Sequence, residues 1–426
     1  MQIISESNLL AIIKATASPI DLRLISHGER VAFILYKMMQ AEGGYSPEQM
    51  KDICMLGLLH DIGAYKTEDI DRMVEFESHD VWAHSIYGYI FMKAFSPLGD
   101  LCDSILYHHL SYDLLGASPC NNKDIADKIH LADRIDILIR SGLSTKLYGI
   151  LNSLAGRTFS SGGIELFCRA DRELGIVKSL EDKSAVTEIN RIFRSLAFHY
   201  TELTQYLHML VNFIDFQSEF TVAHTMMTAQ LSVEIARLMK LSPLQQDKIY
   251  WGAQFHDLGK IATPLKILEK PGNLTPDEME IMKQHVVHSR EILTPFLDTE
   301  ILEIAVRHHE KLDGSGYPDG LTAKQLTAEQ RILAVGDVMS ALLGKRSYKD
   351  QLDKETTLSI LNQMADRRKL CSDAMCVVTE HFDEIVVRAG GCANRDLEQY
   401  HRFGDEYNNL WQQIASAYPE TIGAAV

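Results

Sequence analysis

The sequence predicts an all-α protein built from two homologous helical domains. Apolar residues recur three or four positions apart over long stretches, for example at Leu231, Ile235 and Leu238, and this spacing is typical of amphipathic helices. Only 11 Pro interrupt the 426 residues, and the apolar–polar alternation of β-strands is hard to find. Motifs of the first half return in the same order in the second half, which indicates two homologous units.

The composition narrows the class of protein. The chain carries 58 acidic and 42 basic residues and a formal net charge of −16, so we expect it not to bind long nucleic acid, which requires clustered Lys and Arg. A small phosphorylated ligand is compatible with this charge, because bound metal ions supply positive charge locally. No apolar run of roughly 18 residues or more occurs, and we therefore expect no membrane span.

Other features of the sequence favour a cytoplasmic location. The N-terminal segment MQIISESNLLAIIK lacks the basic start and the cleavage site of a signal peptide. The seven Cys show neither disulfide-type nor metal-type spacing, and reduced thiols are typical of the cytoplasm. The sequence does not determine the oligomeric state, and a homo-oligomer stays open.

The internal repeat has a period of about 200 residues. Each copy has a histidine before a helical stretch, a His-Asp-x-Gly segment, a third histidine, a His-His pair and an aspartate. We predict domains at 1–200 and 201–426, and we expect the last 60 or so residues to pack on the second domain. The first copy comprises His27, His60, Asp61, His84, His108, His109 and Asp133, and the second comprises His224, His256, Asp257, His285, His308, His309 and Asp337.

The second copy forms a ligand set for divalent metal ions. Neutral imidazole and carboxylate suit Fe, Mn, Ni and Zn, and the lack of an accompanying Cys argues against a structural zinc site. A lone histidine in a helical protein is usually a surface or hydrogen-bonded residue, so the prediction depends on the full set and on its repetition. Seven ligands suit two metals about 3.5–4 Å apart, with open positions for water and substrate.

Five motifs of the second half stand in a characteristic order. They are HDLGK at 256–260, PLKILEKPGNLTPDE at 264–278, HHEKLDGSGYP at 308–318, DVMSAL at 337–342 and KRSYK at 345–349. This pattern closely resembles the HD-GYP family over residues 215–360. Members of that family are all-α and hydrolyse cyclic dinucleotides at a centre of two or three metals. The resemblance implies two divalent metals of the Fe, Mn, Ni or Zn class on the seven residues of the second copy, with Asp257 as the bridge.

The resemblance also implies roles on the substrate side. Asp257 and Lys260 become the catalytic residues, because an ammonium group at Lys260 stabilises charge on phosphoryl oxygens. The glycines of DGSGYP permit a turn, whose Tyr317 either supports the loop or touches the ligand. Arg346 and Lys349 fall on positions that meet substrate phosphates, and a guanidinium suits bidentate phosphate contact.

Two positions depart from the family pattern. Ser340 replaces the second aspartate of the usual DxxDAL segment. Phe220 stands where three-metal members carry a glutamate, and Glu219 lies one position away. Phe220 therefore favours a centre of two metals over a centre of three.

The first copy keeps every ligand type but lacks the substrate side. Ala64 stands where the second copy has Lys260, and HHLSYDLLG replaces the GYP segment. The retained ligands make the set from His27 to Asp133 a candidate second metal site. Its domain is then a structural remnant, a metal-bound regulatory domain or a phosphohydrolase for a terminal 5′-phosphate, and these alternatives stay open.

We expect the second domain to open a cyclic dinucleotide to a linear 5′-phosphorylated product. The tandem arrangement without a receiver domain resembles bacterial phosphodiesterases of 3′,3′-cyclic GMP-AMP (cGAMP), which favours that substrate over cyclic di-GMP. A non-catalytic cyclic dinucleotide sensor is the alternative from another class, and Lys260 with a complete ligand set argues against it. A (p)ppGpp or deoxynucleotide phosphohydrolase is disfavoured by the GYP loop for the second domain, but not for the first.

Overall fold

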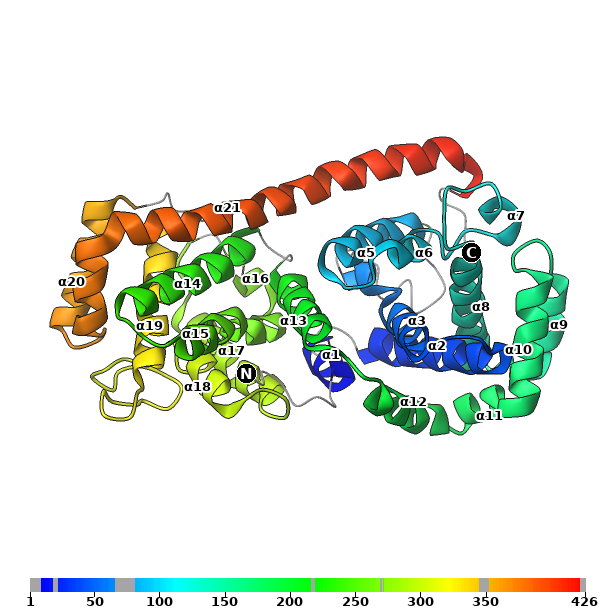
Figure 1. Ribbon diagram of the computed structural model, residues 1–426, viewed down its shortest axis with the longest axis horizontal. Helices are drawn as coiled ribbons and strands as arrows, with labels where there is room; N and C mark the ends of the chain where they lie inside the picture. The colour runs from blue at the N-terminus through cyan, green and yellow to red at the C-terminus, as the bar shows by residue number, and fades with distance from the viewer. Residues whose placement is uncertain are drawn as a thin grey trace. The chain divides into compact units, whose positions relative to one another are not determined.

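The computed structural model describes residues 9–17, 22–65, 81–215, 219–268, 270, 272–344 and 352–421. In these ranges the chain forms α-helices joined by short 3₁₀-helices and loops, with two isolated β-bridges and no β-strand (Figure 1). The prediction of an all-α fold is confirmed. The chain divides into two compact units: a first unit of Ser7–Met209 with Phe403–Val426, and a second unit of Leu210–Arg402.

The first unit is centred on α2 (Leu22–Glu42). This helix lies against α3, α8, α10 and α12, and five consecutive residues, Val31–Leu35, are completely buried, so neighbours enclose it on all sides at this point. The other helices of the unit are α1 (Leu9–Ala17), α3 (Pro47–Leu59), α5 (Val81–Phe95), α6 (Asp103–Leu106), α7 (Tyr112–Leu115), α8 (Lys123–Arg140), α9 (Leu147–Ser153), α10 (Ser161–Leu174), α11 (Ile176–Glu181) and α12 (Ser184–Ser195). α13 (Tyr200–Asp215) leads into the second unit.

The second unit is centred on α14 (Glu219–Leu238). This helix lies against α15 and α19, and the buried Leu231 and Ile235 join a core that continues through α19, α20 and the first part of α21. The other helices are α15 (Pro243–Phe255), α16 (Leu265–Leu268), α17 (Pro276–Leu293), α18 (Thr299–Ala305), α19 (Ala328–Leu343), α20 (Lys354–Asp366) and α21 (Ser372–Ala417).

The two units start equivalent helices in the same way. Ser46 caps α3 and Ser242 caps α15, and each cap forms a reciprocal capping box with a glutamine three residues later, Gln49 or Gln245. Proline follows each cap at the first helical position, where its missing N–H group and fixed φ are favourable. Both helices have 13 residues, and each ends at the histidine of a His-Asp pair.

The helix α21 contributes to both units. Its first part buries Val378, Phe382 and Ile385 in the core of the second unit. In the first unit, Phe403 stacks on Phe95 with 5.7 Å between ring centroids, and Tyr418 beyond the helix stacks on Trp82 at 5.8 Å. We expected the last 60 or so residues to pack on the second domain, and this is wrong for Phe403–Val426. The aromatic contacts with α5 explain the difference.

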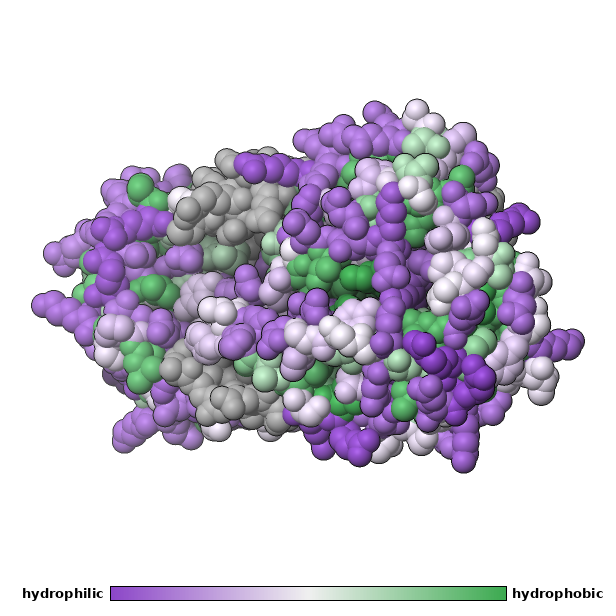
Figure 2. All heavy atoms as spheres, turned by 45° about the vertical axis from the view of Figure 1, so that its right-hand side comes forward, coloured by the Kyte–Doolittle hydropathy of each residue, from purple (hydrophilic) through white to green (hydrophobic). Residues whose placement is uncertain are grey.

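The length and hydropathy of the described helices can be compared with what a membrane span needs. No described helix combines the length and the apolar character needed to cross a membrane. Figure 2 shows one face of the molecule, on which hydrophilic residues predominate and hydrophobic residues form small patches.

Candidate metal centres

The turn after α15 brings a His-Asp pair close to α17. His256 lies at the C-terminus of α15, and Asp257 precedes the 3₁₀-helix η4 (Leu258–Ala262). Gly259 then touches α17 so closely that a Cβ atom would lie 1.9 Å from the carbonyl oxygen of His285. The glycine of the His-Asp-x-Gly segment is therefore required for close packing, and this packing places the third histidine beside the pair.

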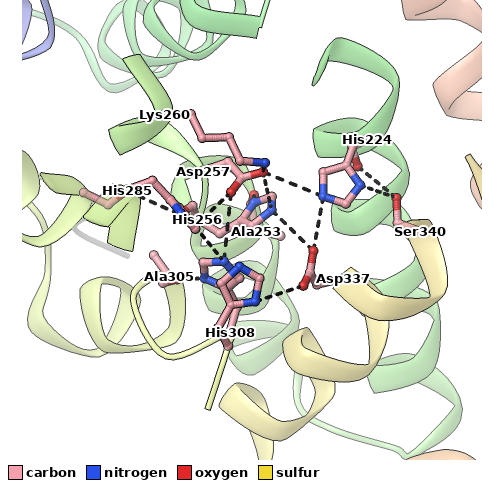
Figure 3. Close-up of polar contacts among 12 residues, drawn as sticks. His224, Ala253, His256, Asp257, Lys260, His285, Ala305, His308, Asp337 and Ser340 are labelled. Carbon is pink, nitrogen blue, oxygen red and sulfur yellow. Dashed lines mark hydrogen bonds and ion pairs between the residues drawn. The ribbon is translucent and has the colours of Figure 1, made fainter. Parts of the chain in front are cut away.

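The seven predicted ligands of the second unit come together in one buried cluster (Figure 3). Asp257 lies at its centre. Its Oδ2 is 3.2 Å from His256 Nε2 and 3.7 Å from His224 Nε2, and its Oδ1 is 3.4 Å from His285 Nε2 and 4.0 Å from His308 Nε2. The two oxygens thus face two different pairs of imidazoles, which is the arrangement that a bridging carboxylate needs.

Asp337, on α19, closes the other side of the cluster. Its Oδ1 is 3.1 Å from His224 Nε2, and its Oδ2 is 3.6 Å from His309 Nδ1. The ring of His309 lies against that of His308, with 3.9 Å between centroids. The same Oδ1 is 3.8 Å from His256 Nε2, so Asp337 contacts the His224–His256 pair through one oxygen and His309 through the other.

Backbone hydrogen bonds set the orientation of three ligand histidines. The Nδ1 atoms of His256, His285 and His308 each lie 2.6 Å from the carbonyl oxygen of the residue three positions earlier. A carbonyl accepts a hydrogen bond, so each Nδ1 carries the proton and each Nε2 presents its lone pair to the cluster. Preset tautomers of this kind are typical of metal ligands.

The electrostatic environment favours the metal-binding protonation state at three residues of the cluster. His256 is the exception, because Asp257 and Asp337 outweigh its burial and raise its pKa above the usual value. Burial lowers the pKa of His285 to about 4 and that of His309 to about 3, so both rings are neutral at pH 7. Burial opposes ionisation of Asp257, but the charges of His256 and Lys260 outweigh it and hold the pKa of Asp257 well below its usual range. Neutral imidazole and ionised carboxylate are the ligand forms.

Buried atoms without hydrogen bonds show that these residues fit a metal ion. In the described part of the chain, His256 Nε2 is buried and makes no hydrogen bond, and the same is true of His60 Nε2, His108 Nε2 and Asp61 Oδ1 in the first unit. A buried polar atom without a partner costs about 1–3 kcal/mol. Several such atoms in the first cluster and one in the second are accounted for if cations bind there.

The open side of the second cluster carries Lys260 and Tyr317. The Nζ of Lys260 lies 2.5 Å from Asp257 Oδ2, and the Tyr317 ring packs on His309 at 4.7 Å between centroids. Gly316 permits this packing, because a Cβ atom there would lie 2.6 Å from the carbonyl oxygen of His309. The side chain of His309 is 24% exposed, more than that of any other ligand, which indicates that a substrate approaches from this side.

Some predicted residues lie outside the described part of the chain, and one neighbour of the loop was not predicted. Arg346 and Lys349 fall in residues 345–351, which the structure does not describe. Glu310 is 1% exposed, and its carboxylate accepts hydrogen bonds from the backbone N–H groups of Asp319 (2.7 Å) and Leu321 (2.8 Å). The sequence signal that could have indicated this support of the loop was a glutamate directly after the His-His pair.

The first unit repeats the arrangement around Asp61. One carboxylate oxygen faces His27 and His60, the other faces His84 and His108, and Asp133 completes the cluster 3.0 Å from His27 Nε2. The distances to Asp61 are 3.7 Å from His27 Nε2 and 3.4 Å from His60 Nε2 on Oδ2, and 3.6 Å from each of His84 Nε2 and His108 Nε2 on Oδ1.

A further acceptor holds the first histidine of each cluster. In the first unit, His27 Nδ1 lies 2.7 Å from Asp136 Oδ2; in the second, His224 Nδ1 lies 3.0 Å from Ser340 Oγ. Asp136 was not predicted. Its position three residues after Asp133, which matches the spacing from Asp337 to Ser340, was the signal that identifies it.

Comparisons with known proteins agree with the repeat. Two family models, both described as an HD domain, match residues 24–138 and residues 208–370. The chain is 28% identical over 379 residues to 3'3'-cGAMP-specific phosphodiesterase 1 of Vibrio cholerae. This match covers 84% of this chain and 88% of that protein. It is 27% identical over 396 residues to 3'3'-cGAMP-specific phosphodiesterase 2 of the same organism, covering 85% and 70%.

Other comparisons concern one region or the fold alone. The chain is 39% identical over 177 residues to the cyclic di-GMP phosphodiesterase response regulator RpfG of Xanthomonas campestris, covering 40% of this chain and 46% of that protein. A solved structure, titled as a cyclic GMP-AMP-specific phosphodiesterase of V. cholerae, superposes with a TM-score of 0.54 at 14% identity. It covers 90% of this chain and 98% of the other, so the similarity of fold extends over both units.

Proposed function

We propose that the second of the two HD domains is of the HD-GYP type and hydrolyses 3′,3′-cGAMP to a linear 5′-phosphorylated dinucleotide. One observation carries the proposal: the two oxygens of Asp257 face separate histidine pairs, with Lys260 and the Tyr317 loop on the exposed side. A sensor needs a binding loop but no bridging carboxylate, so this combination favours an enzyme.

The residues divide into a metal side and a substrate side. His224, His256 and Asp337 would hold one divalent ion and His285, His308 and His309 another, with Asp257 between them. Two bound ions of the Fe, Mn, Ni or Zn class would supply an activated water and neutralise charge on the phosphoryl oxygens.

Lys260 and Tyr317 act on the substrate directly in this proposal. The ammonium group of Lys260 stabilises the charge that develops on a phosphoryl oxygen, since metal binding at Asp257 leaves that group free to turn toward substrate. Tyr317 packs on His309 and holds the loop in place, while its exposed side contacts the ligand. We assign the second phosphate to Arg346 and Lys349, on the strength of the sequence motif.

Similarity over both domains supports cGAMP as the substrate. The 3'3'-cGAMP-specific phosphodiesterases 1 and 2 of V. cholerae match more than four-fifths of this chain, whereas RpfG matches 40% of it and 3'3'-cGAMP-specific phosphodiesterase 3 matches 35%. Cyclic di-GMP is the alternative substrate, and base-reading residues will decide between the two.

Turnover assays test the proposal. Purified protein with added Mn²⁺ is incubated separately with 3′,3′-cGAMP, cyclic di-GMP and cyclic di-AMP, and linear products are separated chromatographically. We expect the highest rate with cGAMP and no product from the His256→Ala/Asp257→Ala variant. Faster turnover of cyclic di-GMP would correct the substrate. Binding without turnover of any of the three, by protein shown to contain metal, would establish a sensor instead.

The intact cluster of the first unit supports a second activity. We propose that this unit is a metal-dependent phosphohydrolase that removes the 5′-phosphate from the linear product, because it keeps the ligand geometry but lacks the lysine and the GYP loop. The Asp257→Ala variant, supplied with a 5′-phosphorylated linear dinucleotide, should release inorganic phosphate. Absence of phosphate release would leave this unit a regulatory or structural role.

A further inference from the structure

The two clusters differ in the group that accepts a hydrogen bond from their first histidine. Asp136, a carboxylate with a fully buried side chain, lies 2.7 Å from His27 Nδ1. In the second unit the acceptor is the neutral hydroxyl of Ser340, 3.0 Å from His224 Nδ1. Both residues occupy the same position, three residues after the aspartate of the cluster.

The orientation of the first histidine is the same in both units. Ser340 Oγ donates its proton to the carbonyl oxygen of His224 at 3.1 Å, so it accepts from His224 Nδ1. An ionised carboxylate at Asp136 likewise accepts from His27 Nδ1. Each first histidine therefore presents Nε2 to its cluster, and the charge of the acceptor is what differs.

Neighbouring residues show that the difference is built into each unit. Asp136 also accepts hydrogen bonds from Arg30, at 2.5 Å from Nε and 3.1 Å from Nη2, and pairs with Arg140 Nε at 3.2 Å. These guanidinium groups hold the carboxylate in place and compensate for its burial. The equivalent positions of the second unit, three residues after His224 and four after Ser340, are Met227 and Gly344.

We infer that the cluster of the first unit is the tighter of two metal centres, and that Asp136 sets the difference. A carboxylate behind an imidazole raises its basicity as a ligand and fixes its ring, and changes to such partners typically alter metal affinity by about 10–100-fold. The inference rests on the metal-binding part of the proposed function and is independent of turnover. At limiting metal concentration, the first centre fills before the second.

Variants with a single centre separate the two affinities. The His256→Ala/Asp257→Ala chain keeps the first centre, and the His60→Ala/Asp61→Ala chain keeps the second. Each full-length variant is dialysed against buffers of fixed free Mn²⁺, and bound metal is measured by elemental analysis. We expect half-saturation of the first centre at roughly tenfold lower free Mn²⁺ than the second. Equal affinities, or tighter binding at the second centre, would overturn the inference.

Substitutions of the two acceptors, Asp136 and Ser340, test whether the acceptor causes the difference in metal affinity. Asp136→Asn keeps an acceptor of the same shape but removes its charge, and should weaken Mn²⁺ binding at the first centre about tenfold. Ser340→Asp should tighten the second centre by a similar factor, a gain that misfolding cannot produce. Asp124→Asn, the matched control, makes the same substitution at an exposed carboxylate on the same helix, where it contacts Lys128 and not the cluster, and should leave binding unchanged. Unchanged affinities after both acceptor substitutions would refute the role of Asp136.

These measurements distinguish failure of the inference from failure of the proposed function. A first centre that binds no Mn²⁺ removes the inference, while cGAMP hydrolysis at the second centre is unaffected. Conversely, a protein whose second centre binds Mn²⁺ but hydrolyses no cyclic dinucleotide fails the proposed function, while the order of affinities still stands.

Discussion

Replacing Lys260 by Gln should lower turnover strongly while the metal stays bound. The Nζ of Lys260 lies 2.5 Å from Asp257 Oδ2, and its side chain is 20% exposed, so the ammonium group is beside the metal side yet accessible from the substrate side. Asp257 keeps its contacts to His256 and His285 without the lysine. We therefore expect the cluster to keep its metal content in the variant.

The magnitude follows from the position of the charge. A unit charge about 4 Å from a developing oxyanion contributes about 4 kcal/mol at an effective dielectric constant near 20. This corresponds to a factor of about 10³ in rate, and removal of one such donor in enzymes costs about 10²–10³. Because Lys260 is partly exposed, water replaces some of the lost interaction, and we expect a loss near 10²-fold, mainly in kcat.

The assay compares the initial rate of cGAMP hydrolysis of the variant with that of wild type at saturating Mn²⁺. The metal content of each protein is measured in parallel. Lys266→Gln, an exposed lysine on α16, is the matched control and should turn over as wild type does. Lys260→Arg should restore part of the rate, because it restores the charge. A wild-type rate in Lys260→Gln would refute the catalytic role. Loss of metal together with rate would reassign Lys260 to support of Asp257.

Three further predictions concern the loop, the core and pH. Glu310→Ala leaves two loop N–H groups without their charged acceptor and should raise KM for cGAMP and lower the free energy of unfolding by about 1.5–3 kcal/mol in urea titrations. Trp82→Ala removes a ring that is 2% exposed and stacked on Tyr418, and should lower the free energy of unfolding by about 3–5 kcal/mol. Burial lowers the pKa of His285 to about 4 from 6.5, so between pH 4 and 6.5 the folded metal-free protein binds fewer protons than the unfolded chain. The free energy of unfolding should therefore fall as the pH falls from 6.5 toward 4. Circular dichroism measures this loss of stability.

The fold and the ligands could be predicted because each leaves a pattern in the sequence. The three-to-four spacing of apolar residues follows from helices that bury one face, as α14 does with Leu231 and Ile235. The ligands could be found because the same geometric requirement acts twice: Gly63 and Gly259 each make a close contact with the helix that carries the third histidine. A repeated requirement produces a repeated motif.

The groups that surround the ligands leave a weaker pattern. Asp136 and Ser340 do the same geometric task with different chemistry, so the two halves agree there in spacing but not in residue type. The sequence also could not predict where α21 packs. Phe403 is an aromatic residue that could pack on either domain, and nothing in the sequence near it indicates which one. Its partner, Phe95 on α5, is known only from the three-dimensional arrangement.

The separation of metal side and substrate side explains how one fold holds two different sites. In both units the ligands lie at helix ends or on helices that pack tightly, so their positions follow from the core. Lys260 and the GYP segment instead lie in η4 and in the loop between α18 and α19. A loop can change without disturbing the core, as the segment between α6 and α8 does in the first unit. The ligand positions and the substrate side can therefore diverge independently, and the first unit keeps the ligand residues without the lysine and the GYP segment.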